Sequence, residues 1–188
     1  MNKVIFLDID GVLNTKWWYT QMERNTPKDK YGYAFDPKAV ANLKRIVEET
    51  GADLVVSSSW KCMGLSQIEE MWRDRSLPGK IIGITPNSVS DEMLLNADFD
   101  SIELFHIRGE EIKQWLTKYG KQVSNYAIID DMDNMLSEQQ SRFVHTNPEV
   151  GTRKKTYAYY EGKRYYHKKK RQAQRRMGNI GGNIMKLQ

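Results

Sequence analysis

The sequence predicts an α/β fold, a three-layer sandwich with a mostly parallel sheet between helices and no large cap domain. Short apolar runs alternate along the chain with longer amphipathic segments that have the periodicity of helices. Residues 4–7 form an unbroken apolar run, typical of a strand buried on both faces, and acidic residues follow directly at Asp8 and Asp10. Open α/β sheets bind their ligands at this end of their strands.

The remaining strands are predicted from further apolar runs. The four main strands cover residues 3–9, 52–56, 80–84 and 126–129, and two shorter ones cover residues 102–106 and 142–145. Helical segments separate most of these runs, so the strands are expected to lie parallel, joined by right-handed crossovers.

Two helices are predicted in the first half of the chain. The first begins at Pro37 and ends at Gly51, because proline favours the first helical turn and glycine favours the residue after the last. The second begins at a capping box formed by Ser66 and Glu69 and ends before Pro78.

A third helix is predicted from near Arg108 to a stop at Gly120. Its apolar side chains, spaced so that they share one face, are Ile112, Trp115, Leu116 and Tyr119. Residues 87–98, upstream of this helix, have no clear pattern.

Four groups of polar residues fall where these strands end or where the third helix begins. They are Asp8 with Asp10, Ser57, Arg108, and Asp130 with Asp131. Alternate side chains of a strand share a face, so the first two carboxylates are expected to converge. Adjacent carboxylates repel and usually need a divalent cation or a shared proton. The groups therefore indicate a binding or catalytic site at one edge of the sheet.

In this order the groups resemble the four motifs of the haloacid dehalogenase superfamily of phosphohydrolases. These motifs are an Asp-x-Asp-Gly strand end, a Ser or Thr strand end, a Lys or Arg at a helix start, and a terminal acidic pair. The runs Asp-Gly-Val-Leu-Asn, Val-Val-Ser-Ser-Ser-Trp-Lys and Arg-Gly-Glu-Glu-Ile-Lys-Gln-Trp-Leu are similar to the subgroup found with RNA-repair proteins. That subgroup is related to the phosphatase half of polynucleotide kinase/3′-phosphatases. The resemblance covers about residues 3–152.

The resemblance implies a Mg²⁺-dependent phosphatase. Asp8 would be the nucleophile that forms an aspartyl-phosphate, and Asp10 would be the general acid and base. Mg²⁺ would be held by Asp8, the backbone carbonyl of Asp10, and the terminal pair, with Asp131 the direct ligand and Asp130 supporting it.

Further residues would bind the phosphoryl group. Ser57 and the backbone near it, including Gly11 and Ser58, would hold the phosphoryl oxygens, and Arg108 would offset their charge. Two lysines compete with Arg108 for this role: Lys61, expected at the surface beside Ser58, and Lys80, at a strand start.

Residues 15–35 are too few to form a separate cap, so the cleft is expected to be open to the end of a polymer. This segment holds Trp17, Trp18, Tyr19, Tyr31, Tyr33 and Phe35, together with Lys16, Arg24, Lys28 and Lys30. Such a mixture suits the stacking and backbone contacts of single-stranded nucleic acid. For Trp17 and Trp18, substrate binding and packing remain equally open, whereas Trp60 and Trp72 are assigned to packing.

A basic extension is expected to follow the domain, with a division into residues 1–152 and 153–188. From residue 153 onward, twelve Lys or Arg residues against one Glu give a net charge of +11, which leaves −6 for the rest of a chain of total charge +5. Tyrosines interleave with these bases, which suits either nucleic-acid binding or a solvated tail. Residues 157–166 predict a hairpin and residues 167–177 a basic helix.

The sequence therefore predicts a phosphatase that acts on phosphorylated nucleic acid ends, with the 3′ preference resting on the resemblance alone. Two alternatives remain open: a phosphatase for nucleoside monophosphates or other small metabolites, and a nucleic-acid-binding protein with a vestigial site. No Gly-x-x-x-x-Gly-Lys-Ser/Thr loop is present, so kinase or ligase activity would come from a separate partner. One cysteine, Cys62, and the lack of a long apolar run predict a soluble, cytoplasmic protein without a membrane partner.

Overall fold

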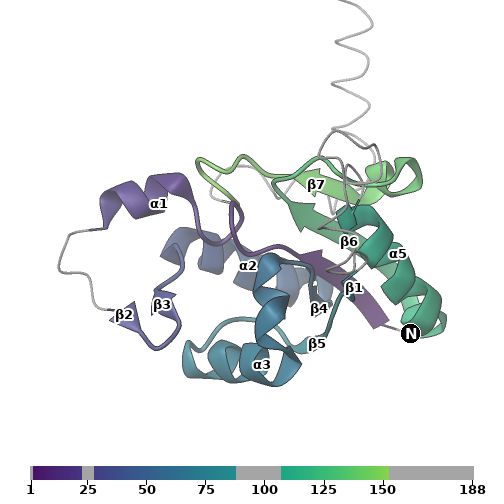
Figure 1. Ribbon diagram of the computed structural model, residues 1–188, viewed down its shortest axis with the longest axis horizontal. Helices are drawn as coiled ribbons and strands as arrows, with labels where there is room; N and C mark the ends of the chain where they lie inside the picture. Colours follow the sequence, from purple (N-terminus) through teal and green to yellow (C-terminus); the bar gives the residue numbers. More distant parts are fainter. Residues whose placement is uncertain (1, 23–27, 88–106, 153–188) are drawn as a thin grey trace, which may run out of the picture. The chain divides into compact units, whose positions relative to one another are not determined.

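The protein is described by a computed structural model that covers residues 2–22, 28–87 and 107–152 (Figure 1). Its main sheet has five strands in the order β5-β4-β1-β6-β7. These strands are β1 (Asn2–Leu7), β4 (Asp53–Val56), β5 (Ile81–Ile84), β6 (Val123–Asp130) and β7 (Phe143–His145). Each neighbouring pair is parallel, which confirms the predicted α/β fold.

The register of the central strands aligns their carboxyl ends. Leu7, the last residue of β1, pairs with Val56 of β4 on one side and with Ile129 of β6 on the other. The residues that follow these three positions therefore emerge side by side at one edge of the sheet. Ser57 and Asp130 flank Asp8 there, as the sequence pattern predicts.

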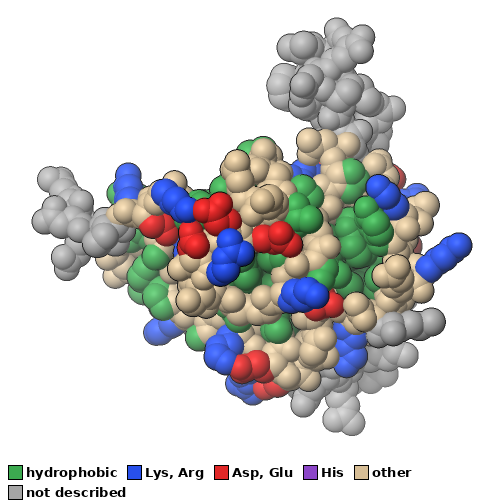
Figure 2. Space-filling model, turned by 90° about the horizontal axis from the view of Figure 1, so that it is seen from below, with side chains coloured by type: hydrophobic (Ala, Val, Ile, Leu, Met, Phe, Trp, Pro, Cys, Tyr) green, Lys and Arg blue, Asp and Glu red, His purple; other side chains and the backbone are tan. Residues whose placement is uncertain are grey.

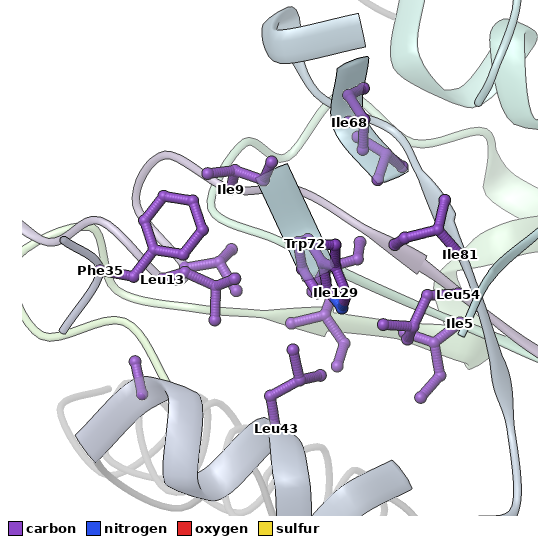
Figure 3. Close-up of a cluster of buried hydrophobic side chains, with 14 of the residues drawn as sticks. Ile5, Ile9, Leu13, Phe35, Leu43, Leu54, Ile68, Trp72, Ile81 and Ile129 are labelled. Atoms are coloured by element: carbon purple, nitrogen blue, oxygen red, sulfur yellow. The ribbon is translucent and has the colours of Figure 1, made fainter. Parts of the chain in front are cut away.

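Alternation along β1 divides the core between the two faces of the sheet. Ile5 and Leu7 belong to a cluster that includes apolar side chains of α2 (Pro37–Thr50) and α3 (Leu65–Asp74), and Figure 3 shows part of it. Val4 and Phe6 point to the other face, where they pack with side chains of α5 (Ile107–Tyr119). The result is a three-layer arrangement with helices on both faces.

The bounds of α2 follow the predicted signals. The Asp36 side chain accepts a hydrogen bond of 2.9 Å from the amide of Lys38, and Pro37 occupies the first turn. Gly51 ends the helix in the left-handed conformation, with a φ of 64°.

The capping box predicted for α3 is wrong. The helix begins one residue before Ser66, after Gly64, and no side chain caps its start. The chain enters α3 directly from a 3-10 helix, η1 (Ser59–Met63), and Gly64 makes the turn with a φ of 83°. Ser66 and Glu69 therefore lie within the helix, on its exposed side.

The third predicted helix is confirmed as α5, which leads through a 3-10 turn, η3 (Gly120–Gln122), into β6. A second 3-10 helix, η4 (Ser137–Arg142), precedes β7. The predicted strand at 102–106, the hairpin at 157–166 and the basic helix at 167–177 lie outside the described residues, as does nearly all of the segment 87–98.

Residues 15–35 contribute only short elements to the described structure. They are α1 (Lys16–Gln21) and an antiparallel hairpin of β2 (Lys28–Asp29) and β3 (Gly32–Tyr33). No residue of α1 is buried, as expected for a segment without a core of its own. Among the described helices, none has the length and apolar character to cross a membrane.

Candidate active site

A cluster of three carboxylates lies at the carboxyl edge of the sheet. Asp8 follows β1, Asp130 ends β6, and Asp131 comes next. One oxygen from each carboxylate lies within 4.8 Å of the other two. Asp8 is only 4% exposed, and Asp130 is completely buried. The structure thus brings Asp8 of the first acidic group together with both residues of the last one.

The guanidinium of Arg108 lies between two of these carboxylates. The first turn of α5 carries it so that Nη2 is 3.9 Å from Asp8 Oδ1 and Nε is 3.3 Å from Asp130 Oδ2. Its side chain is 13% exposed, so these charges interact with little screening by water.

The single positive charge of Arg108 does not neutralise three carboxylates, and the raised pKa values of two of them reflect this. Burial raises the pKa of Asp8 to about 6, although Arg108 and Ser58 oppose that rise. Burial and the charge of Asp8 raise the pKa of Asp130 to about 8. A divalent cation among these oxygens would favour the ionised form of both groups.

The donor set fits Mg²⁺. Mg²⁺ is a hard cation that prefers oxygen ligands, and it commonly uses one or two carboxylates together with substrate phosphate. Asp8, Asp130 and Asp131 offer oxygens of this kind at one place. The buried acidic cluster is therefore compatible with a bound Mg²⁺ ion.

Gly11 explains how Asp131 reaches this cluster. Gly11 has a φ of 71°, and a Cβ placed on it would lie 2.2 Å from Asp131 Oδ2. The missing side chain lets the last acidic residue of the cluster lie against the loop that follows β1. The structure therefore gives Gly11 a contact with Asp131, whereas its predicted part in substrate binding stays a prediction.

Asp10 lies apart from the cluster and is exposed. Its Oδ1 accepts a hydrogen bond of 3.1 Å from Asn14 Nδ2, and its Oδ2 accepts one of 2.9 Å from Trp60 Nε1. Trp60 packs against the core as predicted, and its bond to Asp10 is an additional contact that the sequence did not predict. The available signal was its position just after the serines that follow β4, at the same sheet edge as Asp10. Trp72, by contrast, is buried as predicted and donates to the carbonyl of Pro78.

The hydroxyl of Ser57 is suited to receive a ligand. Ser57 is 1% exposed, and its Oγ has no hydrogen-bond partner among the described residues. Its amide, however, already donates to the carbonyl of Leu7 at 2.9 Å, so the side chain alone is available. Ser58 is also buried, and its hydroxyl lowers the pKa of Asp8.

Lys61 is not a surface residue, contrary to the expectation from sequence. Its side chain is 10% exposed, and Nζ lies 2.5 Å from Glu111 Oε2 and 2.9 Å from the carbonyl of Pro86. Burial lowers the pKa of Lys61, and Glu111 opposes that shift. Lys80 is exposed at the start of β5, away from the strand ends. Of the three candidate cations, Arg108 is the one within 4 Å of Asp8.

The two tryptophans of α1 differ in their surroundings. Trp18 Nε1 donates a hydrogen bond of 2.8 Å to the carbonyl of Ala34, which ties the start of the 15–35 segment to its end. Trp17 is 37% exposed. Trp18 is partly exposed as well, so both rings have accessible surface, and their predicted substrate contact stays a prediction.

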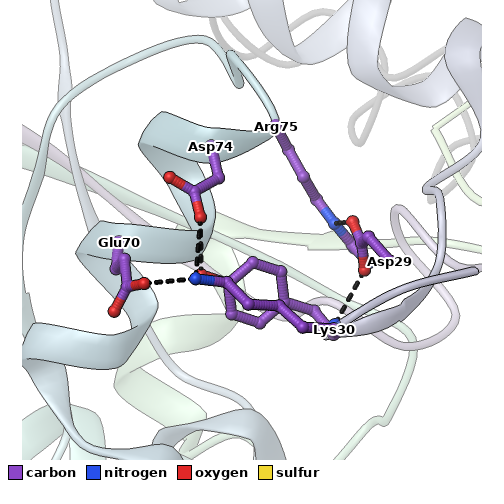
Figure 4. Close-up of polar contacts among 6 residues, drawn as sticks. Asp29, Lys30, Glu70, Asp74 and Arg75 are labelled. Carbon is purple, nitrogen blue, oxygen red and sulfur yellow. Dashed lines mark hydrogen bonds and ion pairs between the residues drawn. The ribbon is translucent and has the colours of Figure 1, made fainter.

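The hairpin of this segment is attached to the end of α3 by ion pairs (Figure 4). Lys30 contacts Glu70 and Asp74, and Asp29 accepts two hydrogen bonds of 2.8 Å from Arg75. On the face that Figure 2 shows, acidic and basic side chains likewise lie next to one another. Lys30 and Arg75 are paired with protein carboxylates, so their first role is to anchor the hairpin.

Fold and site together define the class: the protein is a haloacid dehalogenase-type phosphatase, a hydrolase built on a parallel α/β sheet. Residues 4–156 match the family described as the HAD domain in Swiss Army Knife RNA repair proteins, and the chain belongs to that family. Comparisons with curated proteins and with solved structures found no match.

Proposed function

We propose that the protein hydrolyses the phosphate monoester at a nucleic acid end, a 3′-phosphate, through a phosphorylated Asp8. The observation that carries this proposal is the surroundings of Asp8. This buried carboxylate has the Arg108 guanidinium 3.9 Å away and an oxygen of each of two further carboxylates within 4.8 Å. Such a pairing supplies both a nucleophile and the positive charge that lets it approach a dianion.

The reaction divides into two displacements at phosphorus. In the first, an Asp8 oxygen bonds to phosphorus while the bond to the leaving alcohol breaks, and Asp10 gives that alcohol a proton. In the second, water attacks the acyl phosphate, gives a proton to Asp10, and releases inorganic phosphate and free Asp8. Asp10 is exposed, so it can face a substrate entering from solvent.

The surrounding residues bind and orient the phosphoryl group. Arg108 would pair with its oxygens, and the unpartnered Ser57 hydroxyl would donate to one of them. Asp8, Asp130 and Asp131 would hold Mg²⁺, with the Asp10 carbonyl as a further oxygen. When bound, Mg²⁺ neutralises negative charge on the carboxylates and the phosphoryl group.

Two features support a polymer end as substrate: the small size of the 15–35 segment, and the +11 charge of residues 153–188. One observation favours the small-metabolite alternative. Lys16 is paired with Glu149 at 2.9 Å and Lys30 with Glu70 and Asp74, so these cations are engaged before any polyanion arrives.

A substrate panel tests the proposal. Oligonucleotides with a 3′- or 5′-phosphate and the matching mononucleotides are assayed with Mg²⁺ at two salt concentrations, with Asp8→Asn as the inactive reference. We expect the 3′-phosphorylated oligonucleotide to have the highest kcat/KM, and that value to fall with salt. Higher kcat/KM on mononucleotides, without salt dependence, would establish the metabolite alternative instead.

A further inference from the structure

The carboxylate of Asp10 is oriented by two neighbours. Asp10 lies in the loop beyond β1, where an isolated β-bridge to Asn14 holds its backbone, but an exposed carboxylate can still adopt several rotamers. Here Asn14 Nδ2 donates to Oδ1 at 3.1 Å, and the indole of Trp60 donates to Oδ2 at 2.9 Å. Two directional donors select a single orientation of the carboxylate plane and leave a second lone pair on each oxygen.

The Trp60 indole is itself held in place by packing against Phe35. The rings of Trp60 and Phe35 meet edge to face, with centroids 5.6 Å apart and planes at 71°. Phe35 is 4% exposed, and the guanidinium carbon of Arg75 lies 4.6 Å from its ring centroid. Arg75 in turn donates to both carboxylate oxygens of Asp29. A continuous series of contacts thus runs from the β2–β3 hairpin to Asp10.

We propose that Trp60 is a positioning residue for Asp10, and that the hairpin supports it through the Asp29–Arg75 pair and Phe35. This inference rests on the proposed function, in which Asp10 protonates the leaving oxygen as its bond to phosphorus breaks. The indole N–H takes no part in the proton transfer. It holds the Asp10 carboxyl so that its outer lone pair, or the proton there, faces the leaving oxygen.

The leaving group distinguishes positioning from general damage. Phenolate is a more basic leaving group than p-nitrophenolate. Hydrolysis of phenyl phosphate therefore depends on protonation by Asp10 far more than hydrolysis of p-nitrophenyl phosphate does. Trp60→Phe removes the N–H but keeps an aromatic ring against Phe35. We expect the first-turnover rate with phenyl phosphate to fall roughly 10- to 100-fold, part of what general acid catalysis contributes. The first-turnover rate of p-nitrophenolate release from p-nitrophenyl phosphate should change less than about twofold, because this leaving group needs little acid assistance.

Three further variants sharpen the test. The quantity to compare is the ratio of the first-turnover rate with phenyl phosphate to that with p-nitrophenyl phosphate. Arg75→Gln should lower this ratio by a smaller factor than Trp60→Phe does, because it loosens Phe35 without removing the N–H. Trp72→Phe on α3 removes an indole N–H that bonds to the Pro78 carbonyl, far along the chain from Asp10, and should leave the ratio unchanged. Glu70→Gln weakens the Lys30 ion pair of the hairpin without touching Phe35, and should also leave it unchanged.

The outcomes separate cleanly. Equal loss with both aryl phosphates, or no loss with either, would overturn the role of Trp60. Should Trp60→Phe fail to fold, Trp60→His, which retains a ring N–H, and Arg75→Gln carry the same comparison. The proposed function fails independently if Asp8→Asn still turns over p-nitrophenyl phosphate, whatever the ratio in the Trp60 variants.

Discussion

The pKa values of acidic side chains at the sheet edge are shifted up, whereas those of acidic side chains at the contact between the β2–β3 hairpin and α3 are shifted down. Burial raises the pKa of Asp8 and of Asp130, and one guanidinium does not compensate them. At the hairpin, hydrogen bonds to Arg75 lower the pKa of Asp29, and those to Lys30 lower that of Glu70. The hairpin carboxylates already have their counter-charges, whereas the sheet-edge carboxylates are arranged for a cation and a phosphoryl group.

Removing the nucleophile gives the largest expected effect. Asp8→Asn should lower turnover of p-nitrophenyl phosphate roughly 10⁴-fold or more, because the aspartyl-phosphate cannot form. Without Mg²⁺ its melting temperature should not fall, since one of three neighbouring carboxylates, two of them buried, is removed. Steady-state assays and thermal denaturation measure both. Asp74→Asn, the matched change at the hairpin, should keep activity and lower the melting temperature; the reverse pattern would contradict the comparison.

Arg108→Ala tests the cation of the site. We expect kcat to fall about 100-fold, because the charge facing the phosphoryl oxygens is lost. Stability without metal should drop by about 3 kcal/mol above pH 8, where buried Asp130 is ionised and loses its partner. Urea denaturation and steady-state kinetics measure these changes. Lys80→Ala should change neither, and a greater kcat loss for Lys61→Ala than for Arg108→Ala would assign the role to Lys61.

Gly11→Ala tests the contact that brings Asp131 to the site. An added methyl group collides with the Asp131 carboxylate, so the Mg²⁺ concentration for half-maximal activity should rise roughly tenfold. Gly51→Ala is the control: Gly51 also has a positive φ, of 64°, but nothing lies within 4 Å of its added Cβ. It should cost about 1 kcal/mol of stability and leave the Mg²⁺ titration unchanged. An unchanged titration for Gly11→Ala would show that Asp131 does not bind the cation.

The smallest expected effect is the loosening of the β2–β3 hairpin at low pH. The pKa of Asp29 lies below its ordinary value of 3.8, so its pairing with Arg75 contributes fully above that pH and is lost as the pH falls through the lowered value. Limited proteolysis with an acid-active protease should therefore cut the hairpin faster below about pH 4. Arg75→Gln should weaken this pH dependence, leaving the part due to the Lys30 pairs, and an undiminished dependence in the variant would show that Asp29 is not the group responsible.

Much of the fold follows from local patterns in the sequence. Burial on both faces makes residues 4–7 of β1 and 54–56 of β4 uninterrupted apolar runs, and Pro37 and Gly51 delimit α2 through their own backbone preferences. The four polar groups follow from the same logic, because parallel strands end at a common edge. The start of α3 could not be found in this way, since it depends on how η1 leads into Gly64.

The contacts missed from the sequence join distant positions. Trp60 and Asp10 are 50 residues apart, and Lys61 pairs with Glu111 across a similar interval. Such pairs leave no periodic signal in one sequence, and a tryptophan or lysine at a strand end has the same local appearance whether it packs, binds or faces solvent. The Asp-Gly step at Gly11 did carry a signal, but its partner Asp131 becomes evident only in three dimensions.

The position of β1 in the sheet has a consequence for synthesis of the chain. β1 lies between β4 and β6, so one of its edges waits for a strand made more than a hundred residues later. Until β6 leaves the ribosome, a nascent chain exposes an apolar, unpaired strand edge of the kind that promotes aggregation. Asp130 and Asp131 arrive with that same strand. Closure of the sheet and completion of the acidic cluster are therefore a single event in folding.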